Sequence, residues 1–176
     1  RPLTSLPSDR RHDVVAGAEK VFWETAATTD FPSQAAREVF YRKYFGYYRD
    51  VQPELFLTAV DEVDTVLGYI CGVADTRLHP ALYRDAAHVP LFDDLYDRYP
   101  AHLHINLTAA SRGRGLGGRL LAALEERVEE GIHLVTDPTA RNVGFYRKNG
   151  YVDAVQRSLD HAEGDMPLLF LGKRLP

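Results

Sequence analysis

Apolar residues in the first 50 positions recur at helical spacing. Ser8 or Asp9 is a good N-cap for a first helix, whose apolar stripe consists of Val14, Val15, Ala18, Val21 and Phe22. Ser33 can cap a second helix, whose apolar face consists of Ala36, Val39, Phe40, Tyr44 and Tyr47. Ahead of both helices, we expect residues 1–4 to end a first strand.

The pattern then changes to that of strands. Residues 55–60 and 65–75 are apolar and β-branched, and the short acidic connection between them predicts an antiparallel pair. Residues 76–100 interrupt this pattern with three prolines, and apolar residues after Pro90 recur at helical spacing. The segment therefore indicates an insertion between strands.

The second half of the chain repeats strand and helix patterns. Residues 102–110 alternate as a strand, and 115–130 form a helix that Gly131 ends as a C′ residue. A strand at 132–137, a short helix ended by Gly150 and a closing antiparallel strand pair follow. The predicted order is strand, two helices, three strands, helix, strand, helix and two strands.

Composition limits the classes of function. The chain has 176 residues, which fits one domain, and its net charge of −4 argues against nucleic-acid binding. No apolar run approaches the roughly 20 residues of a membrane span. The single cysteine, Cys71, excludes an intrachain disulfide and lies in an apolar stretch, where we expect a buried, inert thiol. We expect a cytoplasmic protein, and residues can precede Arg1, which is not a methionine.

A glycine-rich stretch, "SRGRGLGG" at 111–118, raises the question of chemistry. Arg112 and Arg114 stand where a helix begins, a position that disfavours cations unless an anion binds there. Gly113, Gly115 and Gly118 spell G-x-G-x-x-G, and Asp137 follows about 20 residues later, as in dinucleotide-binding folds. Against that interpretation, the preceding strands are antiparallel and arginine occupies both variable positions. A P-loop is excluded because no Lys-Ser or Lys-Thr follows the glycines.

A ligand with more phosphates fits this stretch better. Backbone N–H groups at a helix start and two guanidinium groups favour a diphosphate, and coenzyme A carries a diphosphate and a 3′-phosphate. Residues 112–117 resemble the R/Q-x-x-G-x-G/A signature of the GCN5-related N-acetyltransferase (GNAT) superfamily, and "NVGFYRKNGY" at 142–151 is similar to its second signature. "YPAHLHINL" at 99–107 resembles, more weakly, bacterial relatives of the acetyltransferase-like domain of O-GlcNAcases.

The resemblance implies a fold and a set of site residues. The fold would be α/β (α+β): a mixed, mostly antiparallel twisted sheet of about 6–7 strands flanked by helices. It would form one domain over 1–176, with a helical insertion at about 76–100 before the central strand. The cofactor would be acetyl-CoA, and the residues implied to bind it are Leu107, Thr108, Ala109, Arg112, Gly113, Arg114, Gly115, Leu116, Gly117, Gly118, Asn142 and Tyr146. Leu107 N–H would lie near the thioester oxygen, and Tyr146 would protonate the departing thiolate.

Two histidines are candidates for the general base. His102 and His104 share a face of the central strand, and histidine titrates in the useful pH range. A histidine hydrogen-bonded under the insertion is an equal alternative. His102 and His104 lack a clear third ligand at metal spacing, so we expect no metal site.

The predicted activity is N-acetylation by direct transfer in a ternary complex. The acceptor would be a primary amine of a small molecule or peptide, and the protein a monomer or homodimer without a nucleic-acid or membrane partner. One alternative is a catalytically inactive acyl-CoA-binding or interaction module on the same fold. The third hypothesis is an NAD-binding oxidoreductase. Arg119 and Arg127, on a glutamate-rich helix, are expected to be solvated surface charges.

Overall fold

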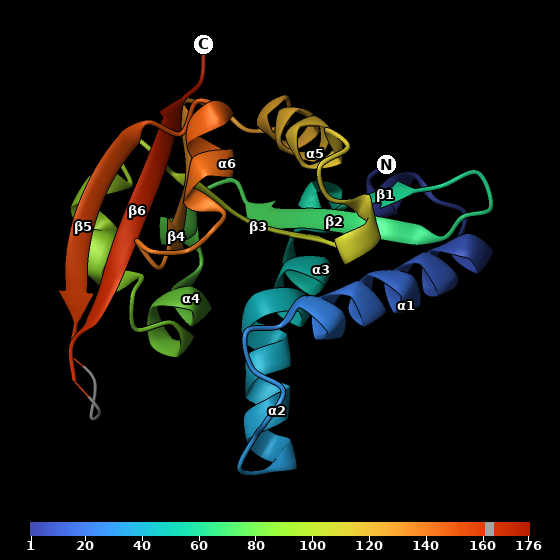
Figure 1. The fold of residues 1–176 in the computed structure, drawn as a ribbon, viewed down its shortest axis with the longest axis horizontal. Helices are drawn as coiled ribbons and strands as arrows, with labels where there is room; N and C mark the ends of the chain where they lie inside the picture. The colour runs from blue at the N-terminus through green and yellow to red at the C-terminus, as the bar shows by residue number, and fades with distance from the viewer. Residues whose placement is uncertain (161–163) are drawn as a thin grey trace. The chain divides into compact units, whose positions relative to one another are not determined.

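The strands form a mixed six-stranded sheet in the order β1-β2-β3-β4-β6-β5 (Figure 1). In the computed structural model, which describes residues 1–160 and 164–176, the strands are β1 Leu57–Val60, β2 Val66–Val73, β3 Ala101–Leu107, β4 Gly131–Thr136, β5 Asp153–Leu159 and β6 Met166–Arg174. β3 and β4 are parallel, whereas β1 pairs antiparallel with β2, and β6 with both β4 and β5. The expected mixed, mostly antiparallel sheet flanked by helices is confirmed.

Helices precede, interrupt and follow these strands. The α-helices are α1 Ser8–Thr25, α2 Gln34–Tyr41, α3 Tyr47–Val51, α4 Pro80–Asp85, α5 Leu116–Glu125 and α6 Val143–Lys148. A π-helical turn, Arg42–Gly46, connects α2 directly to α3. Ser33 caps α2 as predicted, because its side chain accepts a hydrogen bond from Ala36 N–H at 3.1 Å. α1 begins after Pro7 instead, without a side-chain cap.

The chain divides into two compact units. The first contains residues 1–73 and 104–127, and the second contains 74–103 and 128–176. β3 therefore gives its first three residues to the second unit and its last four to the first. A single domain over 1–176 stays a prediction.

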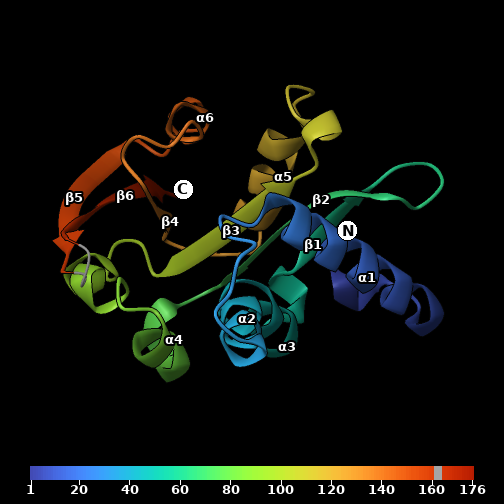
Figure 2. The same cartoon turned by 60° about the horizontal axis from the view of Figure 1, so that its bottom comes forward.

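The first unit packs helices on both faces of β1 and β2. α5 lies on one face and α1 on the other (Figures 1 and 2). The predicted stripe of α1 supplies four buried residues, Val14, Ala18, Val21 and Phe22. Glycine is a poor helix former, but packing explains its presence at position 17 of α1, because a Cβ there would lie 2.6 Å from Val66 Cγ2.

The second unit packs the insertion against its own strands. Phe92, Tyr96 and Tyr99 are buried, and Phe92 and Tyr99 each contact the ring of Phe170 from β6. Arg157 of β5 binds Asp94 of the insertion with two hydrogen bonds, at 2.6 and 2.8 Å. The insertion is therefore an integral part of this unit rather than a projecting loop.

Several predicted boundaries are wrong. Residues 1–4 form only an isolated bridge, Pro2 to Leu57, followed by a 3-10 turn. β3 ends at Leu107, because residues 109–111 turn as a 3-10 helix.

The helix after the glycine-rich stretch is also shorter than predicted. α5 ends at Glu125, and Gly131 is not its C′ residue but the first residue of β4. Glu130 takes the left-handed conformation instead, with φ of 61°. Gly131 is required there for a different reason, since a Cβ would collide with the Arg98 carbonyl oxygen.

Candidate active site

The end of β3 presents one backbone edge away from β2. Thr108 N–H donates to the Leu67 carbonyl at 3.0 Å. Because successive residues of a strand direct their N–H groups to opposite edges, Leu107 N–H points away from β2. Arg112 Nε donates to the Leu107 carbonyl at 3.3 Å, on that same outer edge. The outer edge at Leu107 therefore carries a backbone donor that the β2 ladder does not use.

The ladder between β3 and β4 is short. In the described residues it consists of Ala101 with Ile132 and His102 with His133, both within the second unit. β4 continues for three more residues, Leu134, Val135 and Thr136, which pair with β6 on its other side. The β4 edge opposite β6 therefore has no described strand partner after His133.

The glycine-rich stretch forms a tight turn into α5. Ser111 N–H donates to the Thr108 carbonyl at 3.0 Å, and the two hydroxyl oxygens lie 2.7 Å apart. Gly113 and Gly115 have φ of 73° and 75°, in the left-handed region that favours glycine. A Cβ on either would meet no atom within 4 Å, so both face open space.

The start of α5 leaves backbone donors for a ligand. Gly115 precedes the helix without a side-chain hydrogen bond, and Arg119 N–H is the donor to its carbonyl, at 3.2 Å. The N–H groups of Leu116, Gly117 and Gly118 therefore precede the first intrahelical bond. With exposed Arg112 and Arg114 beside them, these donors have the chemistry of a phosphate site. The open space at Gly113 and Gly115 fits the close approach of a diphosphate.

Tyr146, in the second unit, has a buried ring and an accessible hydroxyl. Its side chain is 5% exposed and contacts the rings of Phe145 and Tyr151. The hydroxyl has no hydrogen-bond partner among the described residues, yet it is not one of their buried unsatisfied atoms, so it reaches solvent. Burial raises the pKa of Tyr146 above its ordinary value of 10.0, so the hydroxyl keeps its proton. This is the state that a proton donor requires.

Asn142 lies immediately before α6 and does not cap it through its side chain. Its Oδ1 instead accepts a long hydrogen bond from the Thr136 hydroxyl at 3.5 Å. Thr139 donates through its hydroxyl to Asp137 at 2.6 Å. The Asn142 side chain is thus directed toward the end of β4.

The two candidate bases lie in different surroundings. His102 is 8% exposed, and its Nδ1 lies 3.0 Å from the hydroxyl of Thr76, a residue of the insertion. That hydroxyl also donates to the Pro100 carbonyl at 2.8 Å, so the His102 ring is held in a buried network. His104 is half-buried, and its Nε2 lies 3.0 Å from the Tyr48 hydroxyl. Exposure therefore favours His104 for exchange of a proton with a substrate.

Cys71 is fully buried in β2, as expected. Burial raises the pKa of its thiol far above the ordinary value of 9.0. A neutral, inaccessible thiol is a poor nucleophile, so the only cysteine of the chain is unsuited to carry an acetyl group.

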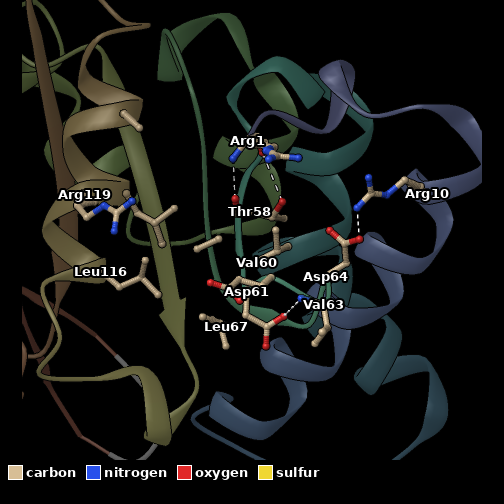
Figure 3. Close-up of a pocket in the computed structure, with 14 residues that line it drawn as sticks. Arg1, Arg10, Thr58, Val60, Asp61, Val63, Asp64, Leu67, Leu116 and Arg119 are labelled. Atoms are coloured by element: carbon tan, nitrogen blue, oxygen red, sulfur yellow. Dashed lines mark hydrogen bonds and ion pairs between the residues drawn. The ribbon is translucent and has the colours of Figure 1, made fainter.

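A groove lies in the first unit between α5 and the β1–β2 hairpin (Figure 3). It has a volume of about 1260 Å³, and Leu116, Leu67, Arg119 and Asp61 are among the residues that line it. Arg10 and Asp64 form an ion pair at its far wall, and Asp61 accepts hydrogen bonds from Val63 and Thr65 N–H. Neither Arg112 nor Arg114 lines this groove. The groove therefore shares Leu116 with the glycine-rich stretch, and Arg119 lines it, whereas Arg112 and Arg114 do not.

Sequence reasoning missed two residues that shape these sites, Thr76 and Gly68, and did not distinguish Tyr48 from the other five aromatic residues between positions 40 and 48. Gly68 lies in an apolar strand, and glycine there is a signal of close backbone approach. Tyr48 and Thr76 carry no such signal, because their roles depend on residues distant in the sequence.

Two kinds of feature are absent from the residues that the structure describes. Within 1–160 and 164–176, no group of three or more His, Cys, Asp or Glu side chains could hold a metal ion. Over the same residues, no helix combines the length and apolarity needed to cross a membrane.

Comparison with known proteins gives the family. Residues 20–151 match the acetyltransferase (GNAT) family. The crystal structure of SsHAT is similar over 99% of this chain and 96% of that one, with 25% identity and a TM-score of 0.63. Naa20 from Chaetomium thermophilum, in complex with a bisubstrate analogue, is similar over 93% and 81%, with 21% identity and a TM-score of 0.55. The NatB acetyltransferase complex bound to CoA and MES matches over 90% and 95%, with 19% identity and a TM-score of 0.58. The chain therefore belongs to the acetyltransferase (GNAT) family, a family of N-acetyltransferases.

Proposed function

We propose that this protein transfers an acetyl group from acetyl-CoA directly to a primary amine in a ternary complex. The observation that carries the proposal is the turn into α5. It combines three uncapped backbone donors, two left-handed glycines facing open space and two exposed arginines. The similar Naa20 and NatB structures hold a bisubstrate analogue and CoA, which supports coenzyme A as the ligand.

The chain supplies groups suited to holding the coenzyme. Arg112, Gly113, Arg114, Gly115, Leu116, Gly117 and Gly118 would bind its phosphates, mostly through main-chain N–H groups. Leu107, Thr108 and Ala109 would bind the pantetheine arm, and Asn142 would contribute from the start of α6. When bound, acetyl-CoA supplies the activated acetyl thioester.

Three steps of the chemistry fall to protein groups. Leu107 N–H, directed to the outer edge of β3, would stabilise negative charge on the thioester oxygen. Tyr146, which keeps its proton, would donate it to the departing thiolate. His104 would take the proton of the amine, because His102 is buried in its bond to Thr76. The buried state of Cys71 favours direct transfer over an acetyl-cysteine intermediate.

A half-exposed aromatic residue beside His104, Tyr44, supports an amine that carries an apolar body. Of the six aromatic residues between 40 and 48, Phe45 and Tyr48 are buried in the core, whereas Phe40, Tyr41, Tyr44 and Tyr47 are half-exposed. The Tyr44 ring approaches that of His104 edge-on, with centroids 5.6 Å apart. A small-molecule or peptide amine with an apolar face would suit this surface.

The experiment has two stages. Calorimetry should detect binding of acetyl-CoA and CoA but not of NAD. An assay of thiol release against a panel of primary amines should then show transfer that depends on the amine. Coenzyme binding without transfer to any amine would indicate the inactive acyl-CoA-binding module, and binding of NAD alone would indicate the oxidoreductase.

A further inference from the structure

His104 and Tyr48 form a hydrogen-bonded pair between β3 and α3. The Tyr48 hydroxyl lies 3.0 Å from His104 Nε2, and the two ring centroids are 5.0 Å apart. Tyr48 is 2% exposed, whereas His104 is half-buried. The tyrosine is thus fixed in the core of the first unit, and it holds one ring nitrogen of a histidine that solvent reaches.

The residues around this pair decide what the hydroxyl can do. Burial raises the pKa of Tyr48 well above 10.0, and Cys71, Tyr44 and Tyr47 reinforce that increase. The Tyr48 hydroxyl therefore keeps its hydrogen and does not become a phenolate. The adjoining turn carries Arg42 and Lys43, and α3 carries Arg49 and Asp50. The Nζ of Lys43 lies 4.9 Å from the centroid of the Tyr44 ring. A hydroxyl oxygen also has lone pairs, so it can accept a hydrogen bond from a ring N–H.

We infer that Tyr48 is a positioning residue, whose hydroxyl oxygen accepts the Nε2–H of His104 while Nδ1 takes the proton of the acceptor amine. This inference rests on the proposed function. The N–H bond of the substrate ammonium breaks, its electron pair stays on nitrogen, and the proton bonds to Nδ1. The resulting imidazolium keeps Nε2–H on Tyr48, and the neutral amine is free to attack the thioester. Nδ1 later releases the proton to water.

The direction of the hydrogen bond between Tyr48 and His104 affects the basicity of the His104 ring. A charged N–H donor forms a stronger hydrogen bond than a neutral one, so an acceptor at Nε2 stabilises imidazolium more than imidazole. Tyr48 as acceptor therefore raises the pKa of His104. Had Tyr48 been the donor instead, it would stabilise neutral imidazole and lower that pKa. The direction of change when the hydroxyl is removed distinguishes the two arrangements.

The test is a pH titration of the histidine rings by nitrogen-15 NMR, on the full chain without ligand. His104→Gln identifies the His104 signals by their loss. In Tyr48→Phe we expect the pKa of His104 to fall by about half a unit to one unit, since one charge-assisted hydrogen bond is lost. We also expect the neutral ring of the unsubstituted protein to carry its hydrogen on Nε2. Tyr44→Phe is the matched control, because it removes a neighbouring hydroxyl whose ring only approaches His104 edge-on, and it should leave that pKa unchanged.

A rise in the pKa of His104 in Tyr48→Phe, no change in it, or a neutral ring protonated on Nδ1 would each overturn the inference. Thermal melting of the variant establishes that it is folded under the titration conditions.

Kinetics separates this inference from the proposed function. With an accepted amine, the acid limb of the rate profile in Tyr48→Phe should move to lower pH by the shift that NMR measures, and kcat on the plateau should fall. KM for acetyl-CoA should not change. If acetyl-CoA does not bind at all, the proposed function fails whatever the NMR result. If transfer proceeds and His104→Gln leaves the rate profile unaltered, the function stands and the inference fails.

Discussion

Gly68 lies so close to β3 that a Cβ on it would stand 2.6 Å from Leu107 Cδ2 and 2.7 Å from the Asn106 carbonyl oxygen. This contact lies beside the Leu67–Thr108 hydrogen bond that turns Leu107 N–H to the outer edge. We expect Gly68→Ala to push β3 away from β2, to cost about 1–3 kcal/mol of stability and to weaken acetyl-CoA binding about tenfold. Thermal melting and calorimetry measure the two effects.

The matched control for that change is Gly172→Ala on β6. There a Cβ would lie 2.8 Å from the Tyr99 ring, so the steric conflict is similar, but both residues belong to the second unit, whereas the glycine-rich turn belongs to the first. This variant should lose stability and keep its affinity for acetyl-CoA. Equal loss of affinity in both variants would mean that Gly68 acts through stability alone.

Gly115 combines a left-handed backbone with the start of α5. Its φ of 75° disfavours side chains, so Gly115→Ala should cost about 1–2 kcal/mol of unfolding free energy. The methyl group would also project into the open space where we place the diphosphate. Gly115→Asn should be less destabilised, because asparagine tolerates this conformation better, yet it should lose acetyl-CoA affinity at least as much. If affinity instead follows stability across the two variants, the space at Gly115 is not used by the ligand.

Arg114 and Arg119 offer a comparison of charges five residues apart. Arg114 lies in the glycine-rich turn, and Arg119 lines the groove of Figure 3. Arg114→Gln should raise the Kd for acetyl-CoA about three- to tenfold at low salt, and this loss should shrink as salt screens the interaction. Arg119→Gln should leave the Kd for acetyl-CoA unchanged. Calorimetry at two salt concentrations checks both variants, and a larger effect at Arg119 would relocate the phosphate site.

Local motifs were sufficient to predict the glycine-rich turn, because its backbone conformation and its N–H groups depend on residues adjacent in the sequence. Gly113 and Gly115 adopt the left-handed conformations that such a turn requires. The capping of α2 by Ser33 was predictable for the same reason, since an N-cap bonds within one helical turn.

Choices that depend on tertiary packing were not available from the sequence. His102 and His104 lie on the same face of β3, so the sequence pattern gives no reason to prefer either as the base. The burial of His102 and its hydrogen bond to Thr76 distinguish the two. Tyr48 is one of six aromatic residues within nine positions, and nothing local indicates which of them meets His104. Glycine is common at helix ends, so the sequence favours that position for Gly131, whereas its role is to avoid the Arg98 carbonyl.

Tyr146→Phe should separate chemistry from binding. The hydroxyl has no partner among the described residues, so its removal should leave the melting temperature within about a degree. Because the pKa of Tyr146 lies above 10.0, the hydroxyl is a proton donor throughout the neutral range, and the rate should show no alkaline limb from this group below pH 10. We expect kcat to fall by about 10²-fold or more with an unchanged Kd for acetyl-CoA. An unaltered kcat would exclude Tyr146 as the acid.

Thr76 tests whether His102 is structural. Its hydroxyl is fully buried, bonds His102 Nδ1 at 3.0 Å and donates to the Pro100 carbonyl at 2.8 Å. Thr76→Val keeps the shape and removes the hydroxyl's bonds to His102 Nδ1 and to the Pro100 carbonyl, which still accepts from the Thr76 backbone N–H at 2.8 Å. Loss of the buried hydroxyl should cost about 1–3 kcal/mol and lower the melting temperature by several degrees. Thr76→Ser, which retains the hydroxyl, should lose much less stability. If His102 has only this role, the rate profile of Thr76→Val below its melting temperature should match that of the unsubstituted protein. A displaced acid limb in that variant would show that His102, rather than His104 alone, takes part in proton transfer.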